Sequence, residues 1–112
     1  MFELRDGSTF DWICKTKVPQ DKKLVPLSFP VTFNLVDQQL VDELIMDEDT
    51  RDPYKFLSLV LVSYSGFPVK DESGADVVDN DERNEMICRS SLFINPLITA
   101  YSDGVAGHKR KN

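Results

Sequence analysis

A strict alternation of side-chain type over residues 27–35 constrains the fold more than any other feature of the chain. Every second residue of this run is large and apolar: Leu27, Phe29, Val31, Phe33 and Leu35. A period of two is typical of a β-strand that buries one face. Pro26 and Pro30 cannot donate backbone hydrogen bonds, so we expect either an edge strand or a strand that donates only from its other positions.

A second alternating run precedes this one. Its inward-facing residues are Phe10, Trp12, Cys14, Thr16 and Val18. Pro19 ends the run, and residues 20–23 are polar enough to form a turn, so the two runs predict an antiparallel β-hairpin. An isolated hairpin is only marginally stable in water, so it must pack against other elements.

The period of the apolar residues changes after residue 36. Asp37 can cap a helix that carries Leu40, Val41, Leu44 and Ile45 on one side. Asp52 followed by Pro53 is typical of a helix start, and Gly66 is placed to end that helix. We therefore expect a buried central helix over residues 53–65, although residues 57–62 alone could form a strand.

Two further helices complete the expected fold. Asp79 or Asn80 can cap a helix over about residues 80–93 that bears Met86, Ile87 and Phe93. Asn95 and Pro96 repeat the cap-then-proline pattern before a last helix, with Gly107 near its end and one apolar face formed by Leu97, Ile98, Tyr101 and Val105. The sequence predicts an α+β fold, an N-terminal antiparallel β-hairpin followed by about four α-helices. We expect one domain over residues 1–107 and a basic disordered tail over 108–112.

Charge is distributed unevenly along the chain, which has a formal net charge of −6. Residues 37–85 carry 14 acidic and 4 basic side chains, whereas residues 1–36 are close to neutral and residues 86–112 are basic. Nucleic acids bind to basic surfaces, so the acidic segment argues against a nucleic-acid partner. No apolar run approaches the ~20 residues of a membrane-spanning helix, so we expect no membrane association. The charged start, residues 1–11, also does not resemble a secretory signal.

Residues suited to catalysis or metal binding are sparse. Cys14 and Cys88 lie far apart and His108 is the only histidine, so a four-ligand zinc site cannot form at the usual spacing. We expect the cysteines to be buried thiols. Residues 71–76 lack the glycine that a calcium-binding loop needs at its sixth position, and no glycine-rich phosphate loop is present. We therefore expect no metal, no cofactor and no enzymatic activity.

The segment around residues 57–62 has more apolar residues than one helix face can hold. The helix is then either central in the fold, which we favour, or leaves one side for a partner. The candidate partner-binding residues are Leu57, Leu61, Tyr64, Leu97 and Tyr101.

The order of these segments resembles the small tail assembly chaperones of long-tailed bacteriophages and prophages. The corresponding pieces, in chain order, are PVTF, VDQQLVDEL, FLSLVLVSYSGF, VKDESG and PLITAYSDGVAGHKRKN. The likeness covers roughly residues 10–112 and lies in the order of the pieces rather than in any one motif. Tyr64 stands where many members of that family carry tryptophan.

The resemblance implies a non-enzymatic role in virion morphogenesis. Members of that family bind the tape measure protein in the host bacterial cytoplasm, keep it soluble, help to recruit tail tube subunits, and are absent from the mature virion. The family has no catalytic residues to transfer to this chain. We also leave open a homo-oligomer and, as alternatives to the chaperone, a small hydrolase and an acidic inhibitor or mimic that binds a basic partner through residues 37–85.

Overall fold

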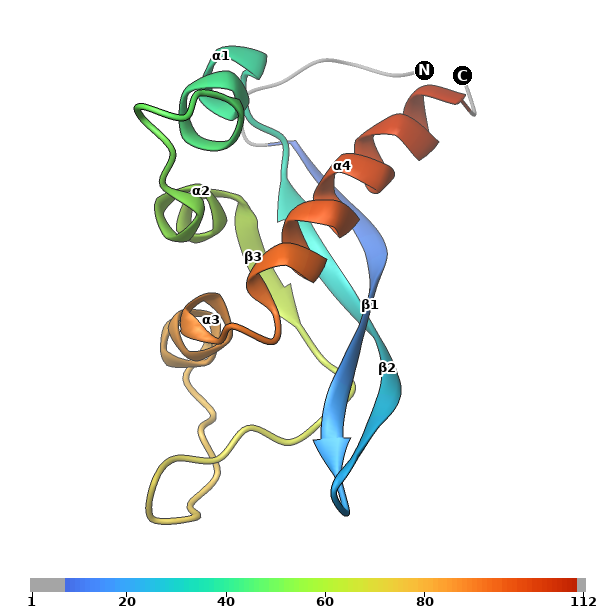
Figure 1. Cartoon of the computed structure of the whole chain (residues 1–112), viewed down its shortest axis with the longest axis vertical. Helices are drawn as coiled ribbons and strands as arrows, with labels where there is room; N and C mark the ends of the chain where they lie inside the picture. The colour runs from blue at the N-terminus through green and yellow to red at the C-terminus, as the bar shows by residue number, and fades with distance from the viewer. Residues whose placement is uncertain (1–7, 111–112) are drawn as a thin grey trace.

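The two alternating runs form the predicted hairpin, and a third strand joins it (Figure 1). The structure is a computed structural model that describes residues 8–110, with side chains for residues 8–107. Its antiparallel sheet has the order β1-β2-β3. The elements are β1 (Thr9–Gln20), β2 (Lys23–Asn34), α1 (Gln38–Val41) with a π-helical turn η1 (Asp42–Met46), α2 (Pro53–Val60), β3 (Leu61–Tyr64), α3 (Asn80–Arg89) and α4 (Ile94–Arg110). The α+β prediction, with an N-terminal hairpin and four helices, is confirmed.

The hairpin places the apolar residues of both strands on one face. Phe10 pairs with Phe33, and Cys14 pairs with Phe29. The turn has only two residues, Asp21 and Lys22, whose φ angles of 50° and 67° match the twist of a tight hairpin. Helices cover this apolar face: α1, α2 and α3 follow one another along one side, and α4 crosses in front of β1 and β2 (Figure 1).

The strand β2 is central in the sheet, so of the two alternatives the edge strand is wrong, and the strand that donates only from its other positions is confirmed. Its prolines are tolerated because of their register. The Leu35 N–H donates to the Ser8 carbonyl at 2.8 Å, so the odd-numbered residues of β2 direct their backbone groups toward β1. Pro26 and Pro30 hold even positions that direct backbone groups away from β1, and the Pro30 carbonyl accepts from the Ser65 N–H on the opposite side at 3.2 Å. Neither proline removes a bond between β1 and β2.

The predicted helix over residues 53–65 is wrong in its second half. The helix α2 ends at Val60, and Leu61–Tyr64 forms β3, which pairs with β2 from Val31 to Phe33. The apolar residues of this segment can satisfy either structure, and the open edge of β2 decides for the strand. Gly66 therefore follows a strand. Its φ of +103° favours glycine, and a Cβ at this position would lie only 3.1 Å from the Phe29 Cβ.

Three helix starts agree with the sequence to within one residue, and one does not. The Asp52 side chain accepts from the Lys55 N–H, and Asp79, not Asn80, caps α3. The helix α4 begins at Ile94, so Asn95 lies inside its first turn and is not the predicted cap. Phe93 lies in the turn between α3 and α4 rather than in a helix.

The C-terminal helix also continues further than expected. The helix α4 extends past Gly107 to Arg110, so helical backbone enters the segment 108–112 that the sequence predicts as a tail. Residues 111 and 112 lie outside the described residues.

The core is one cluster between the sheet and the helices. It includes an aromatic group around Tyr101, whose ring centroid lies 5.3–5.8 Å from those of Phe10, Phe33 and Phe56. The helix α4 approaches β1 closely because it turns two glycines toward it. A Cβ at Gly104 would lie 2.5 Å from the Phe10 ring, and one at Gly107 would lie 2.5 Å from the Trp12 ring.

Candidate protein-binding surface

The five residues predicted to bind a partner all lie in the core. Each side chain is at most 7% exposed: Leu57, Leu61, Tyr64, Leu97 and Tyr101. All five belong to the hydrophobic core between the helices and the sheet, so they do not form a surface. None of them is available to a partner in this conformation, so the first of the two interpretations of the apolar excess, a central segment, describes these residues.

The two tyrosines of this set also hold the fold together through their hydroxyl groups. The Tyr101 hydroxyl accepts from the Val36 N–H at 3.2 Å, which ties α4 to the chain after β2. The Tyr64 hydroxyl donates to the Arg83 carbonyl at 2.6 Å, and the Arg83 guanidinium lies 5.0 Å from the centre of the Tyr64 ring. Burial raises the pKa of Tyr64, so this hydroxyl stays protonated and remains a donor at neutral pH.

The cysteines are structural as well. Cys14 and Cys88 are free thiols, both buried, as expected from the sequence. Burial raises the pKa of each thiol to about 11, so neither is a thiolate at neutral pH. The thiolate is the nucleophilic form, so both residues act as small apolar core side chains.

A surface cleft with acidic walls and apolar side chains is the best candidate for a binding site. It has a volume of about 480 Å³ and lies between the loop before α3 and α3 itself. We define this acidic groove by its lining residues, Asp71, Asp76, Val77, Val78, Asp79, Glu82, Glu85, Met86 and Arg89. Val78 is 86% exposed and Met86 is 40% exposed, so two solvent-exposed apolar side chains lie beside five carboxylates.

Local hydrogen bonding explains how the loop forms one wall of the acidic groove. The Asp71 carboxylate accepts from the Ser73 hydroxyl, the Ser73 N–H and the Ala75 N–H, which closes a tight turn with Gly74 at φ +85°. The Lys70–Asp76 ion pair at 2.7 Å joins the two arms of this loop. Val77 then points into the core, and because successive side chains of an extended segment alternate, Val78 points outward.

The helix α3 forms the other wall of the acidic groove. This wall is acidic because α3 begins in a run of acidic residues. Asp79 caps it by accepting from the Glu82 N–H at 3.1 Å, and acids are favoured near a helix N-terminus. The only cation among the lining residues is Arg89, which pairs with Glu85 at 2.7 Å. Hydrogen bonds from Ser73 and the neighbouring backbone lower the pKa of Asp71, so the carboxylate at the loop end stays ionised. With Asp76 paired to Lys70 and Glu85 paired to Arg89, the acidic groove keeps a net negative charge from Asp71, Asp79 and Glu82.

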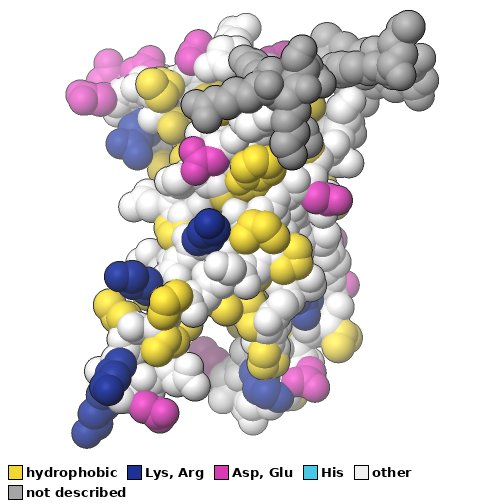
Figure 2. Space-filling view, turned by 90° about the vertical axis from the view of Figure 1, so that its right-hand side faces the viewer, with side chains coloured by type: hydrophobic (Ala, Val, Ile, Leu, Met, Phe, Trp, Pro, Cys, Tyr) yellow, Lys and Arg dark blue, Asp and Glu magenta, His cyan; other side chains and the backbone are white. Residues whose placement is uncertain are grey.

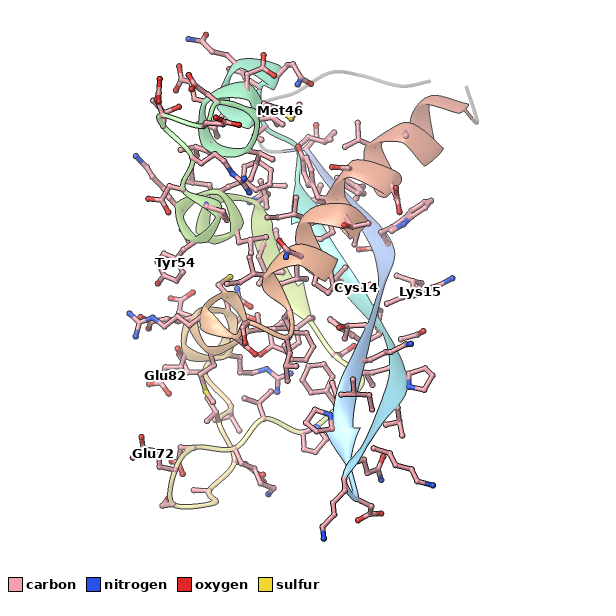
Figure 3. All side chains as sticks on the ribbon, in the orientation of Figure 1. Cys14, Lys15, Met46, Tyr54, Glu72 and Glu82 are labelled. Atoms are coloured by element: carbon pink, nitrogen blue, oxygen red, sulfur yellow. The ribbon has the colours of Figure 1, made fainter. Side chains whose placement is uncertain are left out.

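The surface beside the acidic groove is also partly aromatic. Tyr54, on α2, is 38% exposed, and the Arg89 guanidinium lies 5.7 Å from the centre of its ring. In Figure 3, Tyr54, Glu82 and Glu72 follow one another down the helical side of the molecule, while Lys15 projects from β1 on the opposite side. Acidic and aromatic groups thus share one side.

Sequence reasoning did not find this site. It placed Met86 among the apolar residues of a helix and did not consider Val78. One signal was available: Val77 and Val78 are adjacent apolar residues in an acidic loop, and an extended backbone can bury only one of two neighbours. Which face α3 turns to the core could not be read from a helix with so few apolar residues.

Two other classes of site are absent from the part of the chain that the structure covers. Within residues 8–110, no helix is both long and apolar enough to cross a membrane. Among residues 8–107, whose side chains the structure describes, cysteine and acidic side chains form no group of three suited to holding a metal ion.

Comparison with known proteins adds no further information. No protein-family model, curated protein or solved structure matches the chain.

Proposed function

We propose that the protein is a non-enzymatic tail assembly chaperone of a long-tailed bacteriophage or prophage. It binds the tape measure protein in the host bacterial cytoplasm, helps to recruit tail tube subunits, and is absent from the mature virion. The observation that carries the proposal is the acidic groove, in which exposed Val78 and Met86 lie beside five carboxylates. The resemblance in segment order supplies the identity of the partner.

The acidic groove suits an amphipathic helix with basic residues beside its apolar stripe. Such a helix would lay apolar side chains against Val78 and Met86, a common mode of peptide recognition. Its basic residues would meet the carboxylates of Glu82 and its neighbours, which orient the complex and speed its formation. A tape measure protein is long and largely helical, so many such segments need cover before the tail assembles.

Co-expression with the product of a neighbouring, very long and helix-rich gene tests the proposal. We expect the two proteins to co-purify and the partner's soluble fraction to rise. Replacing both apolar side chains of the groove, Val78→Ser with Met86→Ser, should abolish most of that gain. Leu24→Ser is the matched control, because Leu24 is a 65% exposed apolar residue at the hairpin end, away from the acidic groove.

Two results would contradict the proposal. One is co-expression that yields neither a complex nor a gain in solubility. The other is a complex that the groove variant forms as well as the wild-type chain and the Leu24→Ser control, because the binding surface would then lie elsewhere.

The acidic groove also favours a second candidate function, an acidic inhibitor or mimic that blocks a basic partner. Binding would then depend on the carboxylates, so high salt should weaken it strongly. Glu82→Gln with Glu85→Gln should reduce affinity more than the Val78→Ser and Met86→Ser pair does. If the protein is a chaperone, the Val78→Ser and Met86→Ser pair should reduce affinity more than the two glutamate variants do, and salt should weaken binding only modestly.

A further inference from the structure

The two edge strands of the sheet differ in whether their outward backbone groups have hydrogen-bond partners. At the β3 edge, the Val62 carbonyl accepts from the side-chain amides of both Asn80 and Asn84 at 2.9 Å, and the Tyr64 carbonyl accepts from the Arg83 guanidinium at 3.3 Å. All three donors lie on α3. This helix therefore satisfies the outward carbonyls of β3 and closes that edge to other strands.

Within the described residues, β1 pairs only with β2, so its other edge has no neighbouring strand. Because the even-numbered residues of β1 direct their backbone groups toward β2, its odd-numbered residues direct theirs outward. At Asp11, Ile13, Lys15 and Lys17 the described residues supply no hydrogen-bond partner for these outward groups. An open edge of this length is a template for pairing with another strand. Pro19, also at an odd position, ends the available edge before the hairpin turn.

The side chains along this edge complement themselves in an antiparallel arrangement. If two copies of β1 pair about a twofold axis through Ile13, each Asp11 lies opposite Lys15 of the second copy. The centre of the pair is then Ile13 opposite Ile13, and this side chain is 47% exposed in one chain. Opposite charges and apolar side chains directly across a strand pair both stabilise it.

The β1 strand lies on the side of the molecule away from the acidic groove. In Figure 3, Lys15 of β1 projects on the side of the molecule opposite Glu72 and Glu82. Figure 2, which looks at the side that carries Lys15, shows small hydrophobic groups separated by charges of both signs.

We propose that the protein forms a homodimer in which the β1 strands of two copies pair antiparallel about Ile13, giving one continuous six-stranded sheet. The proposal depends on the β1 edge alone and is independent of what the acidic groove binds. It can be tested on the purified chain without any partner protein.

Disulfide crosslinking tests the register directly. Residues at the twofold centre of an antiparallel pair have Cα atoms about 5.5 Å apart, within the range of a disulfide. Ile13→Cys should therefore give a disulfide-linked dimer under mild oxidation. Lys15→Cys is the matched control on the same strand and face, because two copies of residue 15 would lie roughly 13 Å apart. The wild-type chain, with both cysteines buried, supplies the background.

Sedimentation measurements on charge variants test the pairing without a covalent bond. The wild-type chain should sediment with twice its mass of 12.8 kDa. Asp11→Lys replaces two attractive pairs with two repulsive ones and should raise the dimer dissociation constant roughly tenfold or more. Adding Lys15→Asp to Asp11→Lys restores opposite charges and should restore the dimer. Lys22→Glu, at the hairpin turn, changes the charge away from the pair and should leave the mass unchanged.

Three outcomes would overturn the proposal. They are a wild-type chain that stays monomeric at every concentration, crosslinking of Lys15→Cys equal to that of Ile13→Cys, and a double charge swap that is folded by circular dichroism yet remains monomeric. The Asp11 carboxylate also accepts from the Thr32 hydroxyl at 2.7 Å, so the thermal unfolding of each variant is measured alongside its mass.

Discussion

Asp37 and Asp52 occupy the same position before their helices, but only one makes a capping bond. The Asp52 carboxylate accepts from the Lys55 N–H at 3.0 Å, whereas Asp37 makes no side-chain capping bond. We expect Asp52→Ala to lower the free energy of unfolding by ~1 kcal/mol, because it leaves an N–H of the first helical turn without its partner. Asp37→Ala should have an effect below ~0.5 kcal/mol. Urea denaturation midpoints compare the two, and equal losses would contradict the assignment of the α2 cap.

The buried cysteines predict how stability changes at alkaline pH. Burial raises the pKa of Cys14 and Cys88 from 9.0 to about 11, so between these values the unfolded chain loses thiol protons that the folded chain keeps. The folded state then binds more protons, and the free energy of unfolding falls as pH rises through this window.

Replacing both thiols isolates this contribution. A Cys14→Ala and Cys88→Ala variant should lose less stability between pH 9 and pH 11 than the wild-type chain, whatever its stability at neutral pH. Denaturant unfolding at a series of pH values measures the two slopes. Identical slopes would mean that the thiols titrate alike in the folded and unfolded chains.

Much of the residue-scale structure follows from local pattern. The alternation over residues 27–35 correctly predicts which side chains of β2 face the core, and the inward-facing residues of β1 follow the same rule. The candidate site could not be found in the same way. Whether Leu57 faces a partner or the core depends on which elements pack over it, and no local pattern contains that information.

The strand β3 shows where prediction at the scale of elements stops. Residues 57–62 are apolar without a clear period, and the Asp52-Pro53 start makes a helix reasonable for the whole run. The deciding fact is a vacant edge on β2, some thirty residues earlier in the chain. The sequence of residues 57–62 by itself does not indicate that β2 has a vacant edge, although a strand over these residues is one of the alternatives it allows.

The way in which α3 closes the β3 edge gives a prediction at this scale. Asn80 and Asn84 both donate to the Val62 carbonyl at 2.9 Å, so either one alone leaves the carbonyl with a partner. We expect each alanine variant to lose less than ~0.5 kcal/mol of stability, and the double variant to lose about 1–2 kcal/mol, because only then is the carbonyl without a partner.

A double-mutant cycle on Asn80→Ala and Asn84→Ala measures this coupling by denaturant unfolding. Asn34→Ala is a suitable control, because Asn34 bonds to a different carbonyl, that of Leu59, at 3.4 Å. Strictly additive losses of stability from the two variants would show that neither amide compensates for the loss of the other at the Val62 carbonyl.

At the scale of the whole molecule, the two proposed surfaces lie on opposite sides. Glu72 and Glu82 mark the acidic side in Figure 3, and Lys15 marks the side of the β1 edge. A dimer formed through β1 would therefore leave both acidic grooves accessible. Two linked sites on one long helical partner bind more tightly than either site alone, provided that the spacing of the partner's segments matches.

The overall charge, taken from the sequence, anticipates this division only in part. It correctly identifies residues 37–85 as the acidic segment, and the acidic groove lies largely within it. It does not reveal that β1, with Lys15 and Lys17, would face the other way, because that requires the tertiary fold.

The packing of α4 against β1 has a consequence during synthesis on the ribosome. The last helix supplies Tyr101, whose ring contacts three aromatic rings of the core, and its glycines fit against the first strand. About 60 residues separate the end of β2 from the start of α4. At roughly 5–20 residues per second, the hairpin leaves the ribosome about 3–12 s before the helix that covers it. For that interval the part of the apolar sheet face that α4 covers stays exposed on the nascent chain, so its vulnerability to aggregation is greatest before translation ends.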